Sequence, residues 1–361
     1  MKETTYYATC TPGLEAHCAR WLTRLCSVRV LSQMSGALLF AAHHAPEQRK
    51  VPFLNLMFQV YASWQPAGEP MAFLMSSILG MKHVPQGLAN APFRVMTLKE
   101  NKPVGVAPAM LRAVEQRISQ WTGQPVARAQ PEAEYWVLYR REGVGFWMLR
   151  LWGGAERREA GRLRSELAHA LAFLALPPGD IPPAGEQGAV VLDAFAGSGA
   201  LVEALWQRTG QPALGPVVAV ERTAKLAGNI ANTLRKQRGN AALVRGDALS
   251  TQSHTGQAGP GWWVITGDAR HIPLPNASVS AVCTDPPWGE HEQVEASLYE
   301  DFLQEATRLL VPGGRMVLLG PPALQPVLER SGWVLTMALP VLVSGHKAKA
   351  YVMTTAGAGY M

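Results

Sequence analysis

The stretch VVLDAFAGSGA, at residues 190–200, contains the pattern that decides the fold. Its apolar first part predicts a buried strand, and the acidic residue at the end of that strand is Asp193. A Gly-Ser-Gly turn follows and leads into a helix predicted over 201–208. Glycine lets the backbone approach a ligand closely, and open α/β sheets bind nucleotides at the carboxyl ends of their strands. The stretch therefore predicts a strand–turn–helix unit that binds such a ligand.

Alternating strand and helix patterns continue on the C-terminal side of this unit. Strands are predicted over 217–221, 279–284 and 314–319, and helices over 224–238 and 298–310. Such alternation is typical of a parallel sheet. The tail, 333–353, predicts two further strands around Ser344-Gly-His346. Parallel strands followed by a hairpin predict an α/β fold, a doubly wound sheet with an antiparallel edge.

The helix predicted over 298–310 has sequence signals at both ends. Ser297 and Glu300 have the spacing of a capping box, and Pro312-Gly-Gly is typical of a helix stop. We therefore expect a side-chain cap at its start and a turn directly after its end.

The first 160 residues show a less regular, α+β pattern. Helices are predicted over 12–26 and 108–121, strands over 29–41 around Gly36, and a hairpin over 134–139 and 145–151. A Pro/Gly-rich stretch at 176–185 is typical of a domain boundary or an entry loop. We therefore expect more than one folded part, with a division near residue 160.

The composition is that of a globular chain without a membrane-spanning helix. Of 361 residues, 48% are hydrophobic and 17% are charged. The longest apolar stretches, 51–61 and 71–81, are broken well before the ~18 residues that a span needs. The N-terminus has no signal-peptide core, so we expect an unexported, cytoplasmic protein. The cysteines offer no Cys-x-x-Cys pair, so we expect buried thiols and no metal site.

The net charge of +6 is unevenly distributed along the chain. Residues 1–180 contain 20 Lys and Arg against 13 Asp and Glu, whereas residues 181–361 contain 13 against 14. A basic half joined to a neutral half suggests a polyanion-binding module attached to a part with a different role. A merely solvated surface is the alternative.

Two acidic residues and the glycine turn form a candidate cofactor site. Glu221 ends the second predicted strand, where a carboxylate can bind the ribose hydroxyls of an adenosine. A dinucleotide fingerprint needs Gly or Ala three residues beyond Gly199, where Val202 stands, and this disfavours a dehydrogenase. Asp193, the turn and Glu221 together suggest S-adenosylmethionine. A tight strand–helix turn with exposed acids is the alternative.

TDPPWG, at residues 284–289, is the second motif and follows an apolar strand. Two successive prolines, Pro286 and Pro287, form a rigid turn without N–H donors. The Asp285 carboxylate and the Pro286 carbonyl would accept both N–H bonds of an exocyclic base amine and aim its lone pair at a sulfonium methyl. Trp288 would stack on that base, once the base has left its duplex. A proline turn with a packed Trp is the alternative.

These motifs resemble the ordered motifs of class I methyltransferases that methylate amino groups. The likeness also includes GDARHIPLP at 267–275 and PGGR at 312–315. It implies a Rossmann-like fold, S-adenosylmethionine as the cofactor and a methionine part bound by the glycine loop. By this resemblance Asp268 would contact the adenine amino group, with Asp247 as the rival for that role. The implied cofactor-binding residues are Asp193, Phe195, Gly197, Ser198, Gly199, Ala200, Glu221, Asp268, Ala269 and Asp247.

The N-terminal half is similar to that of the THUMP-domain tRNA methyltransferases. The likeness rests on TCTPGLE at 9–15, on the pattern over 93–151 and on LRSELAHALA at 163–172. It implies three domains in chain order. They are an N-terminal ferredoxin-like part over 1–60, a THUMP-like RNA-binding domain over 61–155 and an S-adenosylmethionine-dependent methyltransferase domain over 156–361.

The resemblance implies N2-methylation of guanosine in tRNA. The likeness is best to enzymes that act on the acceptor-stem guanosine at position six, and position ten is the alternative. The implied partner is tRNA, with no membrane and no obligate protein partner. Four arginines before the catalytic part would meet tRNA phosphates, although the glutamates between them fit a solvated helix face equally well. These are Arg157, Arg158, Arg162 and Arg164.

Asp285 and Trp288 differ from the Asn and the Tyr that the position-six enzymes commonly have in this motif. Asp-Pro-Pro with an aromatic residue also occurs in the enzymes that modify position ten and in adenine-N6 methyltransferases. An adenine-N6 methyltransferase acting on DNA or RNA is therefore the alternative enzyme. A non-catalytic RNA-binding protein with a methyltransferase fold is the alternative from a different class.

Overall fold

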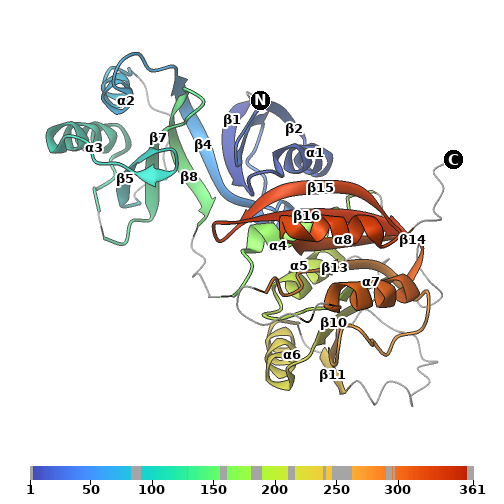
Figure 1. The fold of residues 1–361 in the computed structure, drawn as a ribbon. Coiled ribbons are helices and arrows are strands. Elements are labelled where there is room, and N and C mark those ends of the chain that lie inside the picture. Colours follow the sequence, from blue (N-terminus) through green and yellow to red (C-terminus); the bar gives the residue numbers. More distant parts are fainter. Residues whose placement is uncertain are drawn as a thin grey trace. The chain divides into compact units, whose positions relative to one another are not determined.

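The computed structural model describes residues 3–82, 91–127, 129–154, 161–179, 189–209, 216–238, 241–245, 262–289, 295 and 297–355. The chain forms two compact units (Figure 1). The first consists of Met1–Cys10 and Leu22–Ala155, and the second of Thr11–Trp21 and Glu156–Met361. No helix in the described ranges is both long and apolar enough to cross a membrane.

An eight-stranded sheet with the order β2-β3-β1-β4-β8-β7-β5-β6 forms the centre of the first unit. Its strands are β1 (Thr4–Cys10), β2 (Val28–Met34), β3 (Ala37–Ala42), β4 (Leu54–Trp64), β5 (Phe93–Lys99), β6 (Lys102–Pro103), β7 (Ala133–Tyr139) and β8 (Gly145–Gly153). The pair β5–β7 is parallel, and the other neighbours are antiparallel. Because β4 crosses residue 60, it continues from the predicted 1–60 part into the 61–155 part, and that division stays a prediction.

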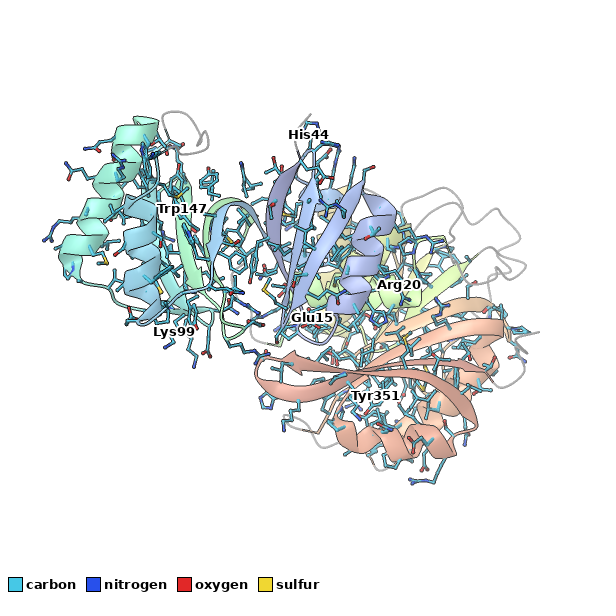
Figure 2. The ribbon with its side chains drawn as sticks, turned by 90° about the horizontal axis from the view of Figure 1, so that it is seen from above. Glu15, Arg20, His44, Lys99, Trp147 and Tyr351 are labelled. Atoms are coloured by element: carbon cyan, nitrogen blue, oxygen red, sulfur yellow. The ribbon has the colours of Figure 1, made fainter. Side chains whose placement is uncertain are left out.

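Helices α2 (Pro70–Leu79) and α3 (Pro108–Thr122) pack on this sheet. Proline is tolerated at the first helical position because the N–H there has no partner within the helix. Gly123 ends α3 in the left-handed conformation, with φ of 72°. Buried side chains of both helices share a core with strand residues such as Trp147, which is fully buried (Figure 2). This core holds the helices against the sheet face formed by β5, β7 and β8.

The second unit contains an eight-stranded sheet with the order β11-β12-β10-β9-β13-β14-β16-β15. The strands are β9 (Val190–Asp193), β10 (Val217–Glu221), β11 (Ala241–Arg245), β12 (Trp262–Thr266), β13 (Val279–Thr284), β14 (Leu310–Gly320), β15 (Trp333–Val343) and β16 (His346–Thr355). The helices are α4 (Ser165–Ala175), α5 (Ala200–Thr209), α6 (Ala224–Arg238), α7 (Leu298–Leu309) and α8 (Gln325–Arg330). Strands β9 to β14 pair in parallel, and β16 is antiparallel to both of its neighbours. The predicted doubly wound α/β sheet with an antiparallel edge is confirmed.

The strand order changes direction at β9, which has β10 on one side and β13 on the other. In open α/β sheets, ligands bind outside the carboxyl ends of the strands at such a point. Asp193, Glu221 and Thr284 end these three strands. The fold therefore brings both sequence motifs to one edge of the sheet.

Two local sequence signals were wrong at element ends. Helix α1 is Glu15–Leu25 and not 12–26, because Gly13 has φ of 96° and cannot join a right-handed helix. Ser297 has a helical φ of −85° and ψ of −9° and makes no side-chain cap, so the predicted capping box is not formed. The predicted helix stop is confirmed, since α7 ends at Leu309, although residues 312–314 then belong to β14, which pairs with β13 through a register irregularity.

The core contains a stacked tryptophan pair and most of the cysteines. Trp262 is buried, and its ring stacks on Trp206 with 4.2 Å between centroids. Cys10, Cys18 and Cys283 are buried free thiols, as predicted, whereas Cys26 is only half-buried. Among the described residues, no group of three or more His, Cys, Asp or Glu is placed to hold a metal ion.

Candidate active site

A cavity of about 630 Å³ lies at the carboxyl ends of β9, β10, β12 and β13. The residues that directly follow each of these strands line it. They are Ala194 and Phe195 after β9, Glu221 and Arg222 at the end of β10, Gly267, Asp268, Ala269 and Arg270 after β12, and Asp285, Pro286, Pro287, Trp288 and Gly289 after β13. The glycine loop contributes Gly197, and the β15–β16 hairpin contributes Ser344 and His346. All four predicted catalytic residues thus line the same cavity as five of the predicted cofactor residues, namely Phe195, Gly197, Glu221, Asp268 and Ala269. Asp193, Ser198, Gly199 and Ala200 lie beside it in the strand end and the glycine loop without lining it.

Asp193 is completely buried at the end of β9. Its Oδ1 accepts hydrogen bonds from the Thr284 hydroxyl at 2.8 Å and from the Phe195 N–H at 3.3 Å. Its Oδ2 is buried and has no hydrogen-bond partner within the described ranges. Burial raises the pKa of Asp193 to about 7, so an ionised Asp193 needs a further donor or a positive charge nearby. The ammonium group of S-adenosylmethionine supplies N–H donors and a positive charge. An ionised Asp193 therefore fits that cofactor.

The glycine loop is tied to the end of β10. The Gly197 N–H donates to Oε2 of Glu221 at 3.0 Å, and the Thr223 N–H donates to Oε1 at 2.7 Å. Gly197 and Gly199 have φ of 49° and 80°, a backbone region that favours glycine. A Cβ on Gly199 would lie 3.3 Å from the Ile230 side chain, a tight contact that a small shift of Ile230 would have to relieve. Glu221 and the loop therefore lie side by side, as a shared adenosine and methionine site requires.

Asp268 follows β12 and lines the cavity beside Ala269. Its carboxylate accepts bonds from the Arg270 side chain, with Nη2 at 2.7 Å from Oδ2, and from the Arg270 N–H at 2.9 Å. The Arg270 guanidinium holds the pKa of Asp268 below its usual range. Arg270 also forms an ion pair with Glu295, which follows the catalytic motif in the chain and lines the same cavity. Sequence reasoning missed Arg270, because its link to Glu295 depends on the fold.

The strand order bears on the choice between Asp268 and Asp247. Strand β12 pairs directly with β10, which ends in Glu221, whereas β11 forms the edge of the sheet. Asp268 therefore follows the strand next to the ribose candidate. Asp247 lies outside the described residues, and its role stays a prediction.

Asp285 opens the catalytic motif and is half-buried. Its Oδ1 accepts the indole N–H of Trp288 at 3.0 Å. Burial is the largest cause that raises the pKa of Asp285, the Trp288 bond lowers the pKa, and the negative charge of Asp193 raises it, so that the pKa lies at about 7. Sequence reasoning placed Trp288 on the target base and missed that its N–H holds the carboxylate.

Tyr299, in the first turn of α7, holds the proline turn from the other side. Its hydroxyl donates to the Pro287 carbonyl at 2.6 Å. Its ring is half-buried, and burial together with the Asp285 charge raises the pKa of Tyr299 to about 12. Tyr299 therefore remains a hydrogen-bond donor at neutral pH. No local sequence signal marks this contact, which depends on where α7 packs.

The four arginines predicted to meet RNA have different environments. Arg162 lines the cavity and donates to the Ser198 carbonyl at 3.2 Å and to Glu203 at 2.7 Å. Arg164 is 54% exposed and lies 3.6 Å from Glu166. Arg162 is thus engaged with the glycine loop, whereas Arg164 faces solvent. Arg157 and Arg158 lie outside the described residues, and the RNA-binding role of all four stays a prediction.

The fold and the site define a methyltransferase of the class I type, with S-adenosylmethionine as its methyl donor. The chain belongs to the UPF0020 family, whose model is described as "RMKL-like, methyltransferase domain" and matches residues 155–347. The match begins one residue before Glu156, where the larger segment of the second unit starts.

Individual proteins that are similar to this chain are also named as methyltransferases. A curated protein of Thermus thermophilus named tRNA (guanine(6)-N2)-methyltransferase is 29% identical over 267 residues, which cover 72% of each chain. The crystal structure of TrmN from Thermus thermophilus is similar with a TM-score of 0.72 and 24% identity, over 98% of this chain and 100% of that one. SMU.472, a putative methyltransferase complexed with SAH, has a TM-score of 0.65 and 12% identity, over 99% of both chains. These two structures support the fold over nearly the whole chain.

Proposed function

We propose that this chain is a tRNA guanosine-N2 methyltransferase that acts on the acceptor-stem guanosine at position six. The observation that carries the proposal is the single cavity in which Asp285 and Trp288 face the cofactor candidates Glu221 and Asp268. The relative named tRNA (guanine(6)-N2)-methyltransferase supports the choice of substrate.

The catalytic turn would hold the guanine amine by its two N–H bonds. One acceptor is the Asp285 carboxylate, where Oδ1 already receives the Trp288 N–H and Oδ2 remains for the amine. The other is the Pro286 carbonyl, on a turn that Tyr299 fixes at the next residue. S-adenosylmethionine, when bound, supplies an electrophilic methyl group beside this turn. Two fixed acceptors orient the amine lone pair for in-line attack.

Asp285 would also receive the proton that the amine nitrogen loses after transfer. A carboxylate whose pKa is raised to about 7 is a better proton acceptor than an exposed one. The indole ring of Trp288 lines the same cavity and would cover one face of the base. Asp193, Phe195, the 197–200 loop, Glu221 and Asp268 to Ala269 would hold the cofactor.

The first unit would position the tRNA. We assign residues 1–60 as a ferredoxin-like part and residues 61–155 as a THUMP-like part. Arg157, Arg158, Arg162 and Arg164 would contribute phosphate contacts from the start of the catalytic part. The excess of Lys and Arg over Asp and Glu in residues 1–180 supports this role. We infer that the enzyme works in the cytoplasm.

The deciding experiment is methyl transfer from labelled S-adenosylmethionine to undermodified tRNA and to duplex DNA, followed by nucleoside analysis. We expect N2-methylguanosine in tRNA, and loss of label when guanosine six of the transcript is replaced by adenosine. N6-methyladenosine would show an adenine methyltransferase, and label in DNA alone would show that RNA is not the substrate. Cofactor binding without transfer to any RNA or DNA would show a non-catalytic protein.

Asp285→Ala tests whether Asp285 acts on the target amine and not on the cofactor. We expect it to abolish transfer while S-adenosylmethionine still binds, because the cofactor residues lie on β9, β10 and β12 and Asp285 follows β13. Loss of both methyl transfer and S-adenosylmethionine binding would contradict the assignment of Asp285 to the target amine.

A further inference from the structure

The β15–β16 hairpin extends past the carboxyl edge of the second sheet. Strand β16 is antiparallel to β14, and the last register pair between them joins Lys349 to Gly320, where β14 ends. Residues 346–348 of β16 and 341–343 of β15 continue beyond that pair, over about 10 Å at ~3.3 Å per residue. Because β14 is parallel to β13, this is the edge at which the catalytic turn follows β13. The hairpin tip therefore lies at the edge of the sheet that holds the cavity.

One face of this hairpin is turned toward the cavity. Side chains alternate along a strand, and register partners share a face. Val341 and its partner Ala348 are 3% and 2% exposed, so their face is turned toward the protein. Val343 and its partner His346, nearer the tip, lie on the same face and line the cavity. Lys347, between His346 and Ala348, lies on the opposite face and is exposed.

A two-residue turn forms the tip of the hairpin. Ser344 and Gly345 have φ of 51° and 94°, and a turn with positive φ at both central residues matches the twist of the flanking strands. Ser344 lines the cavity, as His346 does. The hairpin is also held at its base, because a Cβ on Gly13 would clash with the Pro340 carbonyl and backbone therefore packs on backbone there. The Ser344 hydroxyl and the His346 imidazole thus stand on a braced element at the cavity.

The catalytic turn alone does not select guanine. Asp285 and the Pro286 carbonyl accept N–H bonds, and an amine on guanine or on adenine offers the same two donors. The two bases differ elsewhere, because guanine has two adjacent acceptors, O6 and N7, whereas adenine has an amine beside N7. A site that selects guanine therefore needs hydrogen-bond donors toward these acceptors, and hydroxyl and imidazole groups can donate.

We propose that His346 and Ser344 donate hydrogen bonds to the O6 and N7 acceptors of the target guanine and so select guanine over adenine. This inference rests on the proposed function, because it names the part of the same cavity that recognises the base. The catalytic turn would hold the amine, Trp288 would cover a ring face, and the hairpin tip would hold the acceptors. Base selection and cofactor binding are then on different elements, so a change in the hairpin should alter the first and leave the second intact.

The test combines substitutions in the full-length chain with substitutions of the target base in tRNA transcripts. The transcripts contain guanine, 2-aminopurine or 7-deazaguanine at the target position. Both analogues keep the C2 amine, but 2-aminopurine lacks O6 and 7-deazaguanine lacks N7. We expect His346→Ala to lower kcat/KM about tenfold for guanine and clearly less for an analogue that lacks the acceptor of His346. Effects of an analogue on base pairing cancel, because each transcript is compared between two proteins.

Two further variants test the donors themselves. His346→Gln keeps an N–H donor, and we expect it to recover part of the loss. Ser344→Gly removes the hydroxyl and suits the positive φ, so the turn should persist while kcat/KM falls more for guanine than for one of the analogues.

Lys347→Ala is the matched control, because Lys347 is next to His346 but lies on the opposite face of the hairpin. Any loss that it causes should be equal for the three transcripts. The affinity for S-adenosylmethionine and the thermal unfolding of each variant should match those of the wild-type chain. These readouts separate base selection from damage to the cofactor site or to the fold.

Equal losses for all three transcripts with His346→Ala and with Ser344→Gly would overturn the proposed selection, as would a base-dependent loss with Lys347→Ala. Transcript affinities measured with S-adenosylhomocysteine, which has no methyl group to transfer, give the same comparison without turnover. If the wild-type chain methylates no guanine in tRNA, the proposed function fails, while these affinities still decide the role of the hairpin. If it methylates guanine and the losses are equal, the inference about the hairpin alone is wrong.

Discussion

Asp285 and Trp288 are three residues apart, and their hydrogen bond gives the motif a property that neither residue has alone. Asp285 must be ionised to accept two N–H bonds, yet burial and Asp193 raise its pKa to about 7. The Trp288 N–H stabilises the ionised form at 3.0 Å from Oδ1. A Phe at this position has a ring but no hydrogen-bond donor. The Asp and the Trp in this chain are therefore complementary.

We expect Trp288→Phe to move the acid limb of the pH–activity profile upward by about one unit. A hydrogen bond to a charged group contributes about 1.5–3 kcal/mol, and one pKa unit corresponds to about 1.4 kcal/mol. Without the donor, the pKa of Asp285 rises further, and a protonated Asp285 no longer accepts the amine below that pKa. The measurement is kcat/KM for tRNA from about pH 6 to about pH 9. Weaker stacking alone would lower the whole profile equally, and such a parallel loss would contradict this role.

Sequence reasoning at the residue scale succeeded where a residue stands at the end of a strand. Glu221 and Asp285 lie at one cavity because parallel strands end at the same edge. It missed Arg270 and Tyr299, whose partners are Glu295 and the Pro287 carbonyl. Both contacts involve α7 or the segment just before it, and no spacing in the sequence states where that helix packs.

Helix α7 also fixes the segment that carries Asp268. The backbone N–H of Ile272 donates to Glu305 at 2.6 Å, and Arg308 donates to Glu305 at 2.6 Å. Arg308 further donates to the carbonyls of Ile272 and Leu274, each at 2.8 Å. One helix thus holds the catalytic turn through Tyr299 and the cofactor segment through Arg308.

We expect Arg308→Ala to lower the free energy of unfolding by about 1–3 kcal/mol and to raise the Kd for S-adenosylmethionine severalfold. The substitution removes the hydrogen-bond donors to the Ile272 and Leu274 carbonyls, and it removes the cation that pairs with Glu305. Urea unfolding and calorimetric titration measure the two effects. Arg330→Ala, at an exposed position at the end of α8, is the control. Similar values for both variants would contradict a role of α7 in holding the cofactor segment.

Prediction was uneven among the elements of the second unit. Helix α6 and strand β10 have the predicted ends. Strand β12 was not predicted, because its four successive apolar residues fit either a strand or a buried helix segment. Strand β14 includes Pro312 and two glycines, which normally interrupt a strand, because pairing with β13 continues through an irregular register.

At the scale of the whole molecule, the second unit draws on both ends of the chain. Thr11–Trp21 belongs to it together with Glu156–Met361. Trp21 packs on Phe173 of α4, with 5.3 Å between ring centroids. The predicted division near residue 160 describes the main break in the sequence pattern. No local sequence signal indicates that Thr11–Trp21 belongs to the second unit. The contact becomes visible only when the fold is known.

A substitution at Gly13 tests whether Thr11–Trp21 is part of the second unit. It has φ of 96°, and a Cβ there would lie 1.8 Å from the Pro340 carbonyl oxygen of β15. Gly68 has a similar φ of 78° and nothing within 4 Å of a Cβ, so it isolates the backbone strain. We expect Gly68→Ala to lower the free energy of unfolding by about 1–2 kcal/mol and Gly13→Ala by at least about 2 kcal/mol more, because backbone must move away from the new methyl group.

Urea unfolding of the full chain measures both variants, with S-adenosylmethionine affinity as the second readout. If Thr11–Trp21 is part of the second unit, Gly13→Ala should also weaken cofactor binding, whereas Gly68→Ala should leave it unchanged. Equal destabilisation by the two substitutions would show that the Gly13 contact does not hold in solution. A greater loss at Gly13 would mean that a fragment beginning at residue 156 lacks a segment of its own unit, because that segment lies before Leu22–Ala155 of the first unit in the chain.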